Sequence, residues 1–440
     1  MPELNKLRSA ASEIFGSALV AVDARQAVKR ATSFTGSKLK VVDSEFAIEA
    51  RPIYVVALGK AAFSMTLGLS EVIGEKIQAG VISCPAETVT GTLASDWQIF
   101  PGGHPLPNES SLEAAKAAFG LLDRANRDKA LVIFLVSGGG SAMMEWPRNA
   151  AITLSDLREA NRVLVQCGAS ITEINAVRRA ASSVKGGGLA ARAGAAQFVT
   201  LIVSDTAVGD DASVASGPTL LPPVNSPDAM AVVEDYRLAG ELPKSILQTI
   251  SQNAHETAGV DRGRHYVLLN NSIALQAART KAQSLGFATT VRNDICDQAI
   301  EEGCELLLAG LNSSEAPTQG VCLLSGGEFS CRVRGSGRGG RNLETVLRCA
   351  MRLQQTRVPG QQTVVLSAGT DGIDGSSAAA GAIADELTVE RAISEGMEPE
   401  VFFANSDSYS FFAGLNDAIV TGPTGTNVRD VRVLLRTPDS

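Results

Sequence analysis

A short apolar run that ends in a glycine-bearing polar loop recurs along the chain, and it constrains the fold more than any other feature. The strongest copy covers residues 131–136 (LVIFLV) and passes into the loop 137–141 (SGGGS). A continuous apolar run of this length is typical of a parallel strand covered on both faces. The same pattern leads to Lys60, Asp205, Ser325 and Asp371. The chain is therefore expected to form an α/β fold that binds its ligand outside the carboxyl ends of the strands.

Composition excludes several classes of protein. A chain of 440 residues should form about two or three domains. The net charge of -8, without a long basic tail, disfavours nucleic-acid binding. No apolar run approaches the roughly 18 residues of a membrane span, and the first residues lack a signal-peptide core, so we expect a cytoplasmic protein without membrane segments. Seven cysteines without a CxxC pair fit a reducing compartment. A zinc or Ser-His-Asp site is poorly supplied by the histidines His104, His255 and His265.

The segment around residue 60 predicts a strand-to-helix turn that carries a lysine. Residues 1–50 are expected to be mostly helical, followed by the apolar strand Ile53–Leu58 and then Gly59-Lys60. Lys60 is not a Walker A lysine, because Tyr54 stands where that motif needs its first glycine and neither Ser nor Thr follows the lysine. A lysine at a helix start is poorly placed unless an anion is bound there. We interpret Lys60 as anion-binding, with a solvated surface lysine as the alternative.

Two more strand ends in the first half of the chain carry polar groups. The loop 137–141, with three glycines between two serines, can form a nest of backbone N–H groups for phosphate or carboxylate, or simply a flexible turn. Asp205 ends the strand expected over 198–204, a good position for metal binding or for a base. Between them, Arg178 and Lys185 lie close to the glycines 186–188. They are candidates for ligand binding, and an ordinary basic helix face is the alternative.

The second half of the chain contains the densest basic loop. Residues 323–348 hold glycine clusters at 326–327 and 335–340, and a helix-compatible run follows. Four arginines fall within ten residues: Arg332, Arg334, Arg338 and Arg341. Backbone N–H groups, a helix start and forked guanidinium groups together suit phosphate or carboxylate. A turn-rich hairpin with a solvated basic face, its second arm over 329–334, is the alternative.

Residues 368–375 (AGTDGIDG) place Asp371 and Asp374 between glycines. The spaced ligands and closing glutamate of an EF-hand are missing, so a calcium loop is disfavoured. Mg²⁺ bound together with phosphate fits better, because Mg²⁺ takes one or two carboxylates and leaves its other positions to phosphate and water. An Asx-turn is the alternative. The five polar strand ends and the clustered arginines predict a polyanion site with metal support, as phosphoryl transfer requires.

A dehydrogenase is the main competing interpretation, because residues 335–340 match G-x-G-x-x-G. The dinucleotide version of this motif needs an acidic residue roughly 20 positions later to hold the ribose. No Asp or Glu occurs between Glu344 and Asp371. NAD(P) binding is therefore disfavoured. A sugar-phosphate-binding regulator is a third alternative, but no basic helix-turn-helix segment is visible.

The chain resembles the glycerate 2-kinase family, whose C-terminal part is the MOFRL domain. The matching segments span nearly the whole chain: GKAAFSM, GGHPLPNE, LVSGGGSAMM, INAVRRAASSVKGGGLA, LIVSDTAVGDDASVASGPT, LSGGEFSCRVRGSGRGGRN, SAGTDGIDG and TGTNVRD. The resemblance implies ATP- and Mg²⁺-dependent phosphorylation of D-glycerate at its 2-hydroxyl. Family members are often labelled hydroxypyruvate reductases, which is the dehydrogenase alternative again. One departure is Leu343-Glu344, where the family has Gln-Glu.

The resemblance also implies an architecture and a set of site residues. It implies a Rossmann-like parallel-sheet domain over 1–245, with 405–440 as a candidate completion of it, a smaller α/β domain over 260–404, and an active site in the cleft between them. A homodimer is one open alternative for the assembly. The expected catalytic residues are Lys60, Arg341, Asp205 and Asp371, the two aspartates also being the expected Mg²⁺ ligands. The expected ATP- and substrate-binding residues are Gly59, Ser137, Gly138, Gly139, Gly140, Ser141, Arg178, Lys185, Ser325, Gly326, Gly327, Glu328, Arg338, Asn342, Thr370, Thr426 and Asn427.

Overall fold

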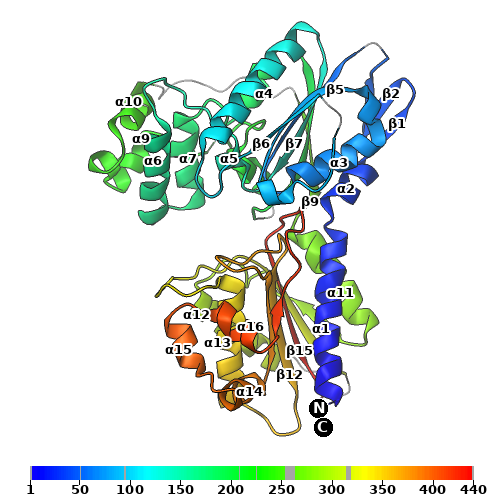
Figure 1. Ribbon diagram of the computed structural model, residues 1–440, viewed down its shortest axis with the longest axis vertical. Helices are drawn as coiled ribbons and strands as arrows, with labels where there is room; N and C mark the ends of the chain where they lie inside the picture. Colours follow the sequence, from blue (N-terminus) through cyan, green and yellow to red (C-terminus); the bar gives the residue numbers. More distant parts are fainter. Residues whose placement is uncertain are drawn as a thin grey trace. The chain divides into compact units, whose positions relative to one another are not determined.

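A computed structural model describes residues 2–49, 51–93, 96–207, 209–223, 225–252, 263–313 and 319–438; His255 lies outside them. The chain divides into two compact units (Figure 1). One consists of Ala24–Leu269 and is called the inserted unit. The other consists of Met1–Asp23 and Asn270–Ser440 and is called the split unit, because the inserted unit interrupts its sequence. In the described part of the chain, no helix has the length and apolar character needed to cross a membrane.

The inserted unit is built on a six-stranded sheet with the order β6-β5-β4-β7-β8-β9, in which all neighbours are parallel. The expected parallel sheet is thus confirmed. The strands are β4 Ile53–Leu58, β5 Ile77–Cys84, β6 Trp97–Pro101, β7 Leu131–Ser137, β8 Gln197–Val203 and β9 Arg264–Leu269. Every residue of β4 and β7 is buried, as expected for strands covered on both faces. The strand order reverses between β4 and β7, which makes their carboxyl ends a topological switch point.

Helices cover this sheet and extend beyond it. The apolar side of α4 packs on the sheet face that contains Tyr54, Val56 and Leu58. A second core joins α6, α7, α9 and α10. The helices are α2 Ala24–Ala31, α3 Ala62–Ile73, α4 Glu109–Arg127, α5 Gly140–Met143, α6 Leu154–Gln166, α7 Ile171–Ala181, α8 Gly188–Ala193, α9 Ala229–Asp235 and α10 Lys244–Gln252, with short 3₁₀ helices η1 Gly74–Lys76, η2 Ala86–Thr88, η3 Asp211–Ser216 and η4 Leu238–Gly240.

Residues 32–47 differ from the expected helical segment. They form a small antiparallel sheet of β1 Thr32–Thr35, β2 Lys38–Val41 and β3 Ser44–Ala47. Leu39, Val41 and Phe46 alternate with exposed neighbours and are buried, which is the period-two pattern of a half-buried strand. The strands are so short that helix-forming neighbours dominate any long sequence window. The helices α1 Pro2–Ala21 and α2 agree with the expectation for the preceding residues.

The split unit has a mixed six-stranded sheet with the order β10-β11-β15-β12-β13-β14. Its strands are β10 Ala288–Val291, β11 Val321–Gly327, β12 Thr363–Gly369, β13 Gly381–Asp385, β14 Ala418–Ile419 and β15 Asp430–Arg436. β15 runs antiparallel to both β11 and β12, and Asp430 is in register with Gly327 on one side and Gly369 on the other. The start of β15 therefore lies at the same end of the sheet as the carboxyl ends of β11 and β12.

Helices cover both faces of this sheet. α1 packs with α11 and lies along β12 and β15, whereas α12 and α13 lie on the opposite face (Figure 1). The remaining helices are α14, α15 and α16. The helices of the split unit after α1 are α11 Asn271–Ser284, α12 Ile300–Asn312, α13 Arg341–Gln355, α14 Thr388–Ser394, α15 Pro399–Ala404 and α16 Ser408–Gly414.

These units differ from the boundaries expected from the sequence. The segment 405–440 belongs to the split unit and does not complete the domain expected over 1–245, because β15 fills the gap between β11 and β12. α1 also belongs to the split unit, since it packs on that sheet. The hairpin arm considered as an alternative over 329–334 is not a strand of the described backbone, where Ser330 forms only an isolated bridge with Ala299.

Candidate active site

Lys60 follows β4 in a turn that is hydrogen-bonded to the loop after β7. Gly59 has a φ of +112°, and a Cβ there would lie 2.3 Å from the carbonyl oxygen of Ser137, so only glycine fits. The backbone N–H of Lys60 donates to the carbonyl of Gly138 at 2.8 Å. The N–H of Ala61 donates to Oγ of Ser137 at 3.0 Å. Hydrogen bonds therefore join the two loops at the switch point.

The loop 137–141 brings further predicted residues to Lys60. A Cβ on Gly138 would lie 1.8 Å from Oδ2 of Asp205, which shows that this carboxylate rests directly on the glycine. A Cβ on Gly139 would lie 3.1 Å from the His104 ring and 3.3 Å from Cγ of Lys60. Lys60, the glycine loop and Asp205 thus converge at one strand edge. Sequence reasoning did not include His104 among the site residues, although its Gly- and Pro-rich loop is itself a visible feature.

Ser141 leads to a second polar group that the sequence did not predict. Its Oγ lies 3.0 Å from Oγ of Ser216. Ser216, which is buried, donates to Oδ1 of Asn175 at 2.9 Å. Asn175 belongs to α7, so this chain of hydrogen bonds ties the glycine loop to that helix. No distinct pattern in the sequence marks Asn175 or Ser216 beyond their place in the quoted motifs.

Lys185 and Arg178 make internal contacts. Only 2% of Lys185 is exposed, and its ammonium group forms an ion pair with the buried carboxylate of Glu145. Burial lowers the pKa of Lys185, and Glu145 opposes this change. Arg178 donates to Oδ1 of Asn161, and burial lowers the pKa of its guanidinium. These contacts do not themselves test ligand binding by either residue, which stays a prediction.

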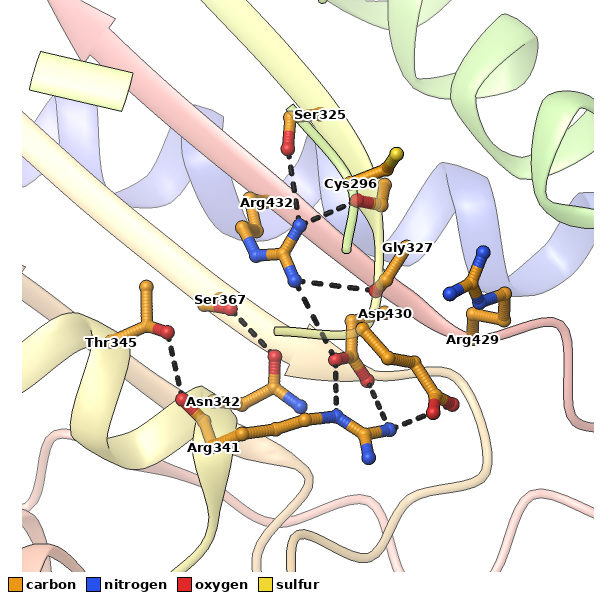
Figure 2. Close-up of polar contacts among 12 residues, drawn as sticks. Cys296, Ser325, Gly327, Arg341, Asn342, Thr345, Ser367, Arg429, Asp430 and Arg432 are labelled. Carbon is orange, nitrogen blue, oxygen red and sulfur yellow. Dashed lines mark hydrogen bonds and ion pairs between the residues drawn. The ribbon is translucent and has the colours of Figure 1, made fainter. Parts of the chain in front are cut away.

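In the split unit, Arg341 and Asp430 form a forked ion pair at the edge where β15 begins (Figure 2). Nε of Arg341 lies 2.6 Å from Oδ2 of Asp430, and Nη2 lies 3.1 Å from Oδ1. Nη2 also lies 2.8 Å from Oε1 of Glu328. Burial disfavours the charged form of Arg341, but the carboxylate of Asp430 outweighs it and raises the pKa of the guanidinium. Burial would likewise raise the pKa of Asp430, but Arg341 lowers it.

Arg432 lies behind this pair and is 1% exposed. It donates to Oγ of Ser325 at 3.1 Å and to the carbonyl of Gly327 at 3.2 Å (Figure 2). Its Nη2 lies 3.8 Å from Oδ2 of Asp430. Burial lowers the pKa of Arg432 to about 10. The predicted ligand residues Ser325 and Gly327, together with Gly326, whose carbonyl also accepts from Arg432, are therefore bound to a buried arginine.

Asp374 fixes the start of α13, the helix that begins with Arg341. Its Oδ1 accepts from the N–H of Asn342 at 3.1 Å, and its Oδ2 accepts from the N–H of Leu343 at 2.8 Å. Asp374 is 3% exposed, and burial raises its pKa to about 7. The side chain of Asn342 accepts a 2.6 Å hydrogen bond from Ser367 on β12.

Asp371 lies beside the same sheet edge. A Cβ on Gly369 would be 3.1 Å from Oδ1 of Asp371 and 3.4 Å from Oδ1 of Asp430. Asp371 accepts from the N–H of Ile373 at 3.2 Å, which is the Asx-turn considered as an alternative. In the described ranges, no group of three or more His, Cys, Asp or Glu side chains is arranged to hold a metal ion.

The other predicted residues of this unit are connected as follows. Thr370 accepts from the N–H of Val428 at 2.8 Å, which ties β12 to the 426–430 loop. Asn427 accepts from the N–H of Arg429 at 3.2 Å, and Thr426 is buried. Arg338 is exposed, and its guanidinium lies 4.7 Å from the centre of the Tyr409 ring.

Glu344, which follows the one departure from the family motif, is buried between two arginines of the split unit. Its carboxylate lies 2.9 Å from Arg334 and 2.8 Å from Arg348. The substitution at the preceding position, Leu343, is fully buried in the core of the unit.

A cavity of 1230 Å³ lies elsewhere in the split unit. It is lined by α12 from Glu301 to Asn312, by the C-terminal half of α13 and by β15 residue Arg436, at the opposite end of β15 from Asp430. None of the predicted site residues lines it.

Comparison with known proteins decides the family. Residues 10–251 match the family described as Domain of unknown function (DUF4147), and residues 321–430 match the MOFRL family. The glycerate kinase of Danio rerio is 32% identical, covering 99% of this chain and 99% of its own length. The chain belongs to the glycerate kinase family. The D-glycerate 2-kinase of Thermotoga maritima, in the same family, is 34% identical over 86% of this chain and 89% of its own.

Solved structures agree with this assignment. The crystal structure of the glycerate kinase from Thermotoga maritima has a TM-score of 0.81 and 31% identity, with 98% of this chain and 99% of that chain covered. A relative in Agrobacterium vitis, 34% identical over 94% of this chain and 95% of its own, has a provisional hydroxypyruvate reductase name.

Proposed function

We propose that the protein transfers the γ-phosphoryl group of ATP to the 2-hydroxyl of D-glycerate and releases 2-phospho-D-glycerate. The convergence of Lys60, the glycine loop 137–141 and Asp205 at the switch point carries this proposal. In open α/β sheets this is where ligands bind. Phosphoryl transfer depends on positioning and charge stabilisation, which a fixed loop and a cation can supply.

Each residue has a proposed role. Lys60 neutralises charge on the transferring phosphoryl group or on the substrate oxygen. The loop 137–141 approaches the phosphates through its glycine backbone. Arg341 binds an oxyanion of the substrates through its guanidinium.

Mg²⁺ fits the chemistry of the carboxylates proposed for it. Asp205 and Asp371 are each a candidate ligand of the ion, since one or two carboxylates suffice when phosphate supplies further ligands. The ion would supply charge neutralisation for the phosphates. A cytoplasmic location and a homodimer stay predictions.

The decisive experiment incubates the protein with D-glycerate, ATP and Mg²⁺ and identifies the product by ³¹P NMR. We expect 2-phosphoglycerate. Formation of 3-phosphoglycerate would keep the kinase and overturn the position of transfer. The parallel incubation contains hydroxypyruvate and NADH, the substrates of the alternative reductase. NADH oxidation there without phosphorylation of glycerate contradicts the proposal.

A further inference from the structure

In the Arg341–Asp430 ion pair, Asp430 is the partner that is fixed more firmly. Asp430 is 1% exposed and is the first residue of β15, between Gly327 and Gly369 in the two neighbouring strands. The side chain of Arg341, by contrast, is 35% exposed. A carboxylate fixed by sheet register on both sides has little freedom, whereas an arginine side chain has several rotatable bonds. The aspartate therefore determines where the guanidinium lies.

Arg432 accounts for the charge balance of this arrangement. Alone, the carboxylate of Asp430 would cancel the charge of Arg341. Arg432 adds a second guanidinium, so Arg341, Asp430 and Arg432 together carry a net charge of +1 (two positive groups and one negative), which Glu328 balances while it is paired with Arg341. A buried charge is costly unless it is paired and hydrogen-bonded. The two terminal nitrogens of Arg432 meet this condition through Ser325 and the carbonyl of Gly327, whereas its buried Nε has no hydrogen-bond partner among the described residues.

One nitrogen of Arg341 remains for a ligand. Nε and Nη2 bind Asp430, and Nη2 also contacts Glu328. Nη1 has no hydrogen-bond partner among the residues that the structure describes, and Figure 2 shows it directed away from Asp430. The half-exposed Glu328 can be displaced by a stronger anion at small cost, because exposed ion pairs contribute little.

We propose that Asp430 is a positioning residue that directs the Nη1 edge of Arg341 toward an oxyanion of the bound substrates, with Arg432 preserving the positive charge. The inference rests on the proposed function, in which Arg341 binds such an oxyanion. The oxyanion is either the carboxylate of the acceptor or the transferring phosphoryl group. In Arg341→Ala, a raised KM for D-glycerate identifies the carboxylate, and a raised KM for ATP identifies the phosphoryl group.

The test replaces the arginine side chain by a free cation. Arg341→Ala should lower kcat by about 10²-fold, the scale of losing one preorganised charged group. Methylguanidinium at non-denaturing concentration should restore part of the rate, because Asp430 still binds a guanidinium in the vacated space. In Arg341→Ala/Asp430→Asn the apparent affinity for methylguanidinium should fall at least about tenfold. Equal rescue with and without the aspartate contradicts the proposal.

Calorimetric binding of methylguanidinium gives the same comparison without any assay of activity. A failure of the proposed function is therefore separable: the protein would make no phosphoglycerate, or Arg341→Ala would keep wild-type kcat, while the binding comparison still decides the role of Asp430. Arg332→Ala, which removes an exposed arginine of the same loop, is the control and should bind no methylguanidinium.

Asp430→Asn removes a negative charge near the buried guanidinium of Arg432 and can prevent folding. A second variant at the same position keeps the proposal testable if the Asp430→Asn protein does not fold. Asp430→Glu keeps the charge but moves the carboxylate by one methylene. It should lower kcat with Arg341 present, whereas Arg341→Ala/Asp430→Glu should be rescued by methylguanidinium as well as Arg341→Ala is, since a free cation can follow the displaced carboxylate. Unchanged kcat in Asp430→Glu overturns the positioning role.

Discussion

The two units place polar groups at the ends of their sheets in different ways. In the inserted unit, parallel strands end at one edge, and the following loops converge there through glycine backbone, with Gly59 and Gly138 in direct contact with Ser137 and Asp205. In the split unit, the antiparallel β15 brings its own first residue, Asp430, to the edge where β11 and β12 end. The contrast shows that a parallel sheet places loops at its site, whereas a mixed sheet can place strand side chains there.

The two constructions should therefore respond to different changes. A backbone site depends on the absence of side-chain atoms, so an added methyl group should damage it. A buried-charge site depends on pairing, so removal of one charge should damage it. The four predictions that follow test this distinction, from the largest effect to the smallest.

Removing the buried charge of Lys185, in the inserted unit, should have the largest effect. Because its removal leaves Glu145 buried without its cation, Lys185→Met should lower the free energy of unfolding by about 3 to 5 kcal/mol. Denaturant unfolding measures this change, and Lys185→Met/Glu145→Gln should recover part of it. Lys38→Met breaks the exposed pair with Glu45 and should cost at most about 1 kcal/mol. An unchanged stability with a raised KM for ATP would instead assign Lys185 to direct ligand binding.

Asp374 should make the split unit's stability depend on pH. Its folded pKa is raised by burial from 3.8 to about 7. Between these values the unfolded carboxyl is ionised while the folded one keeps its proton, so stability falls as pH rises, by up to about 1.4 kcal/mol per pH unit. Thermal unfolding from pH 5 to 8 should show this fall levelling off above pH 7. Asp374→Asn should remove the dependence; a variant with the same profile as the wild type would exclude Asp374 as its cause.

Lys60 should affect catalysis without affecting the fold. Lys60→Met should lower kcat by about 10²-fold or more, because a preorganised charge at the phosphoryl group is lost. The melting temperature should change little, since the lysine is only partly buried. Steady-state kinetics with saturating ATP measures the effect. Lys116→Met, on the exposed side of α4, is the matched control. Near wild-type turnover in Lys60→Met would favour a surface lysine.

Gly138 tests the backbone site with a single methyl group. In Gly138→Ala the new Cβ would meet the Asp205 carboxylate and force it to move. We expect kcat to fall by about tenfold, because displacing a functional group by about 1 Å can reduce the rate by up to 10²-fold. Gly120→Ala adds a methyl group on α4 where no atom lies within 4 Å, and it should leave kcat unchanged. Equal kinetics of the two variants would argue against a role for Asp205.

The sequence was sufficient to predict which polar loops of the inserted unit lie close together, because the carboxyl ends of parallel strands lie at the same end of the sheet. Once Ile53–Leu58 and residues 131–136 are recognised as neighbouring core strands, Lys60 and the loop 137–141 must lie close. The same reasoning could not identify Asp430. Its importance follows from β15 lying between β11 and β12, and strand order is not encoded in local patterns. A partial signal was present, since charges at 430 and 432 within an apolar strand imply buried partners.

Other misses have similar physical causes. The ion pair of Lys185 with Glu145 joins residues 40 positions apart, which no spacing rule predicts. The assignment of α1 to the split unit depends on its packing against β12 and β15, whereas sequence order favoured the neighbouring inserted unit.

The central position of β15 bears on the order in which the units can fold during synthesis. β11 and β12 lie on its two sides and do not pair with each other, so the sheet of the split unit cannot close until residues 430–436 have been made. The inserted unit is continuous in sequence and can fold first, while α1 waits for a sheet formed from residues beyond 288. Contacts between such distant segments slow folding and leave apolar surface exposed meanwhile. The ribosome-bound chain should therefore protect residues 53–203 from proteolysis well before it protects α1.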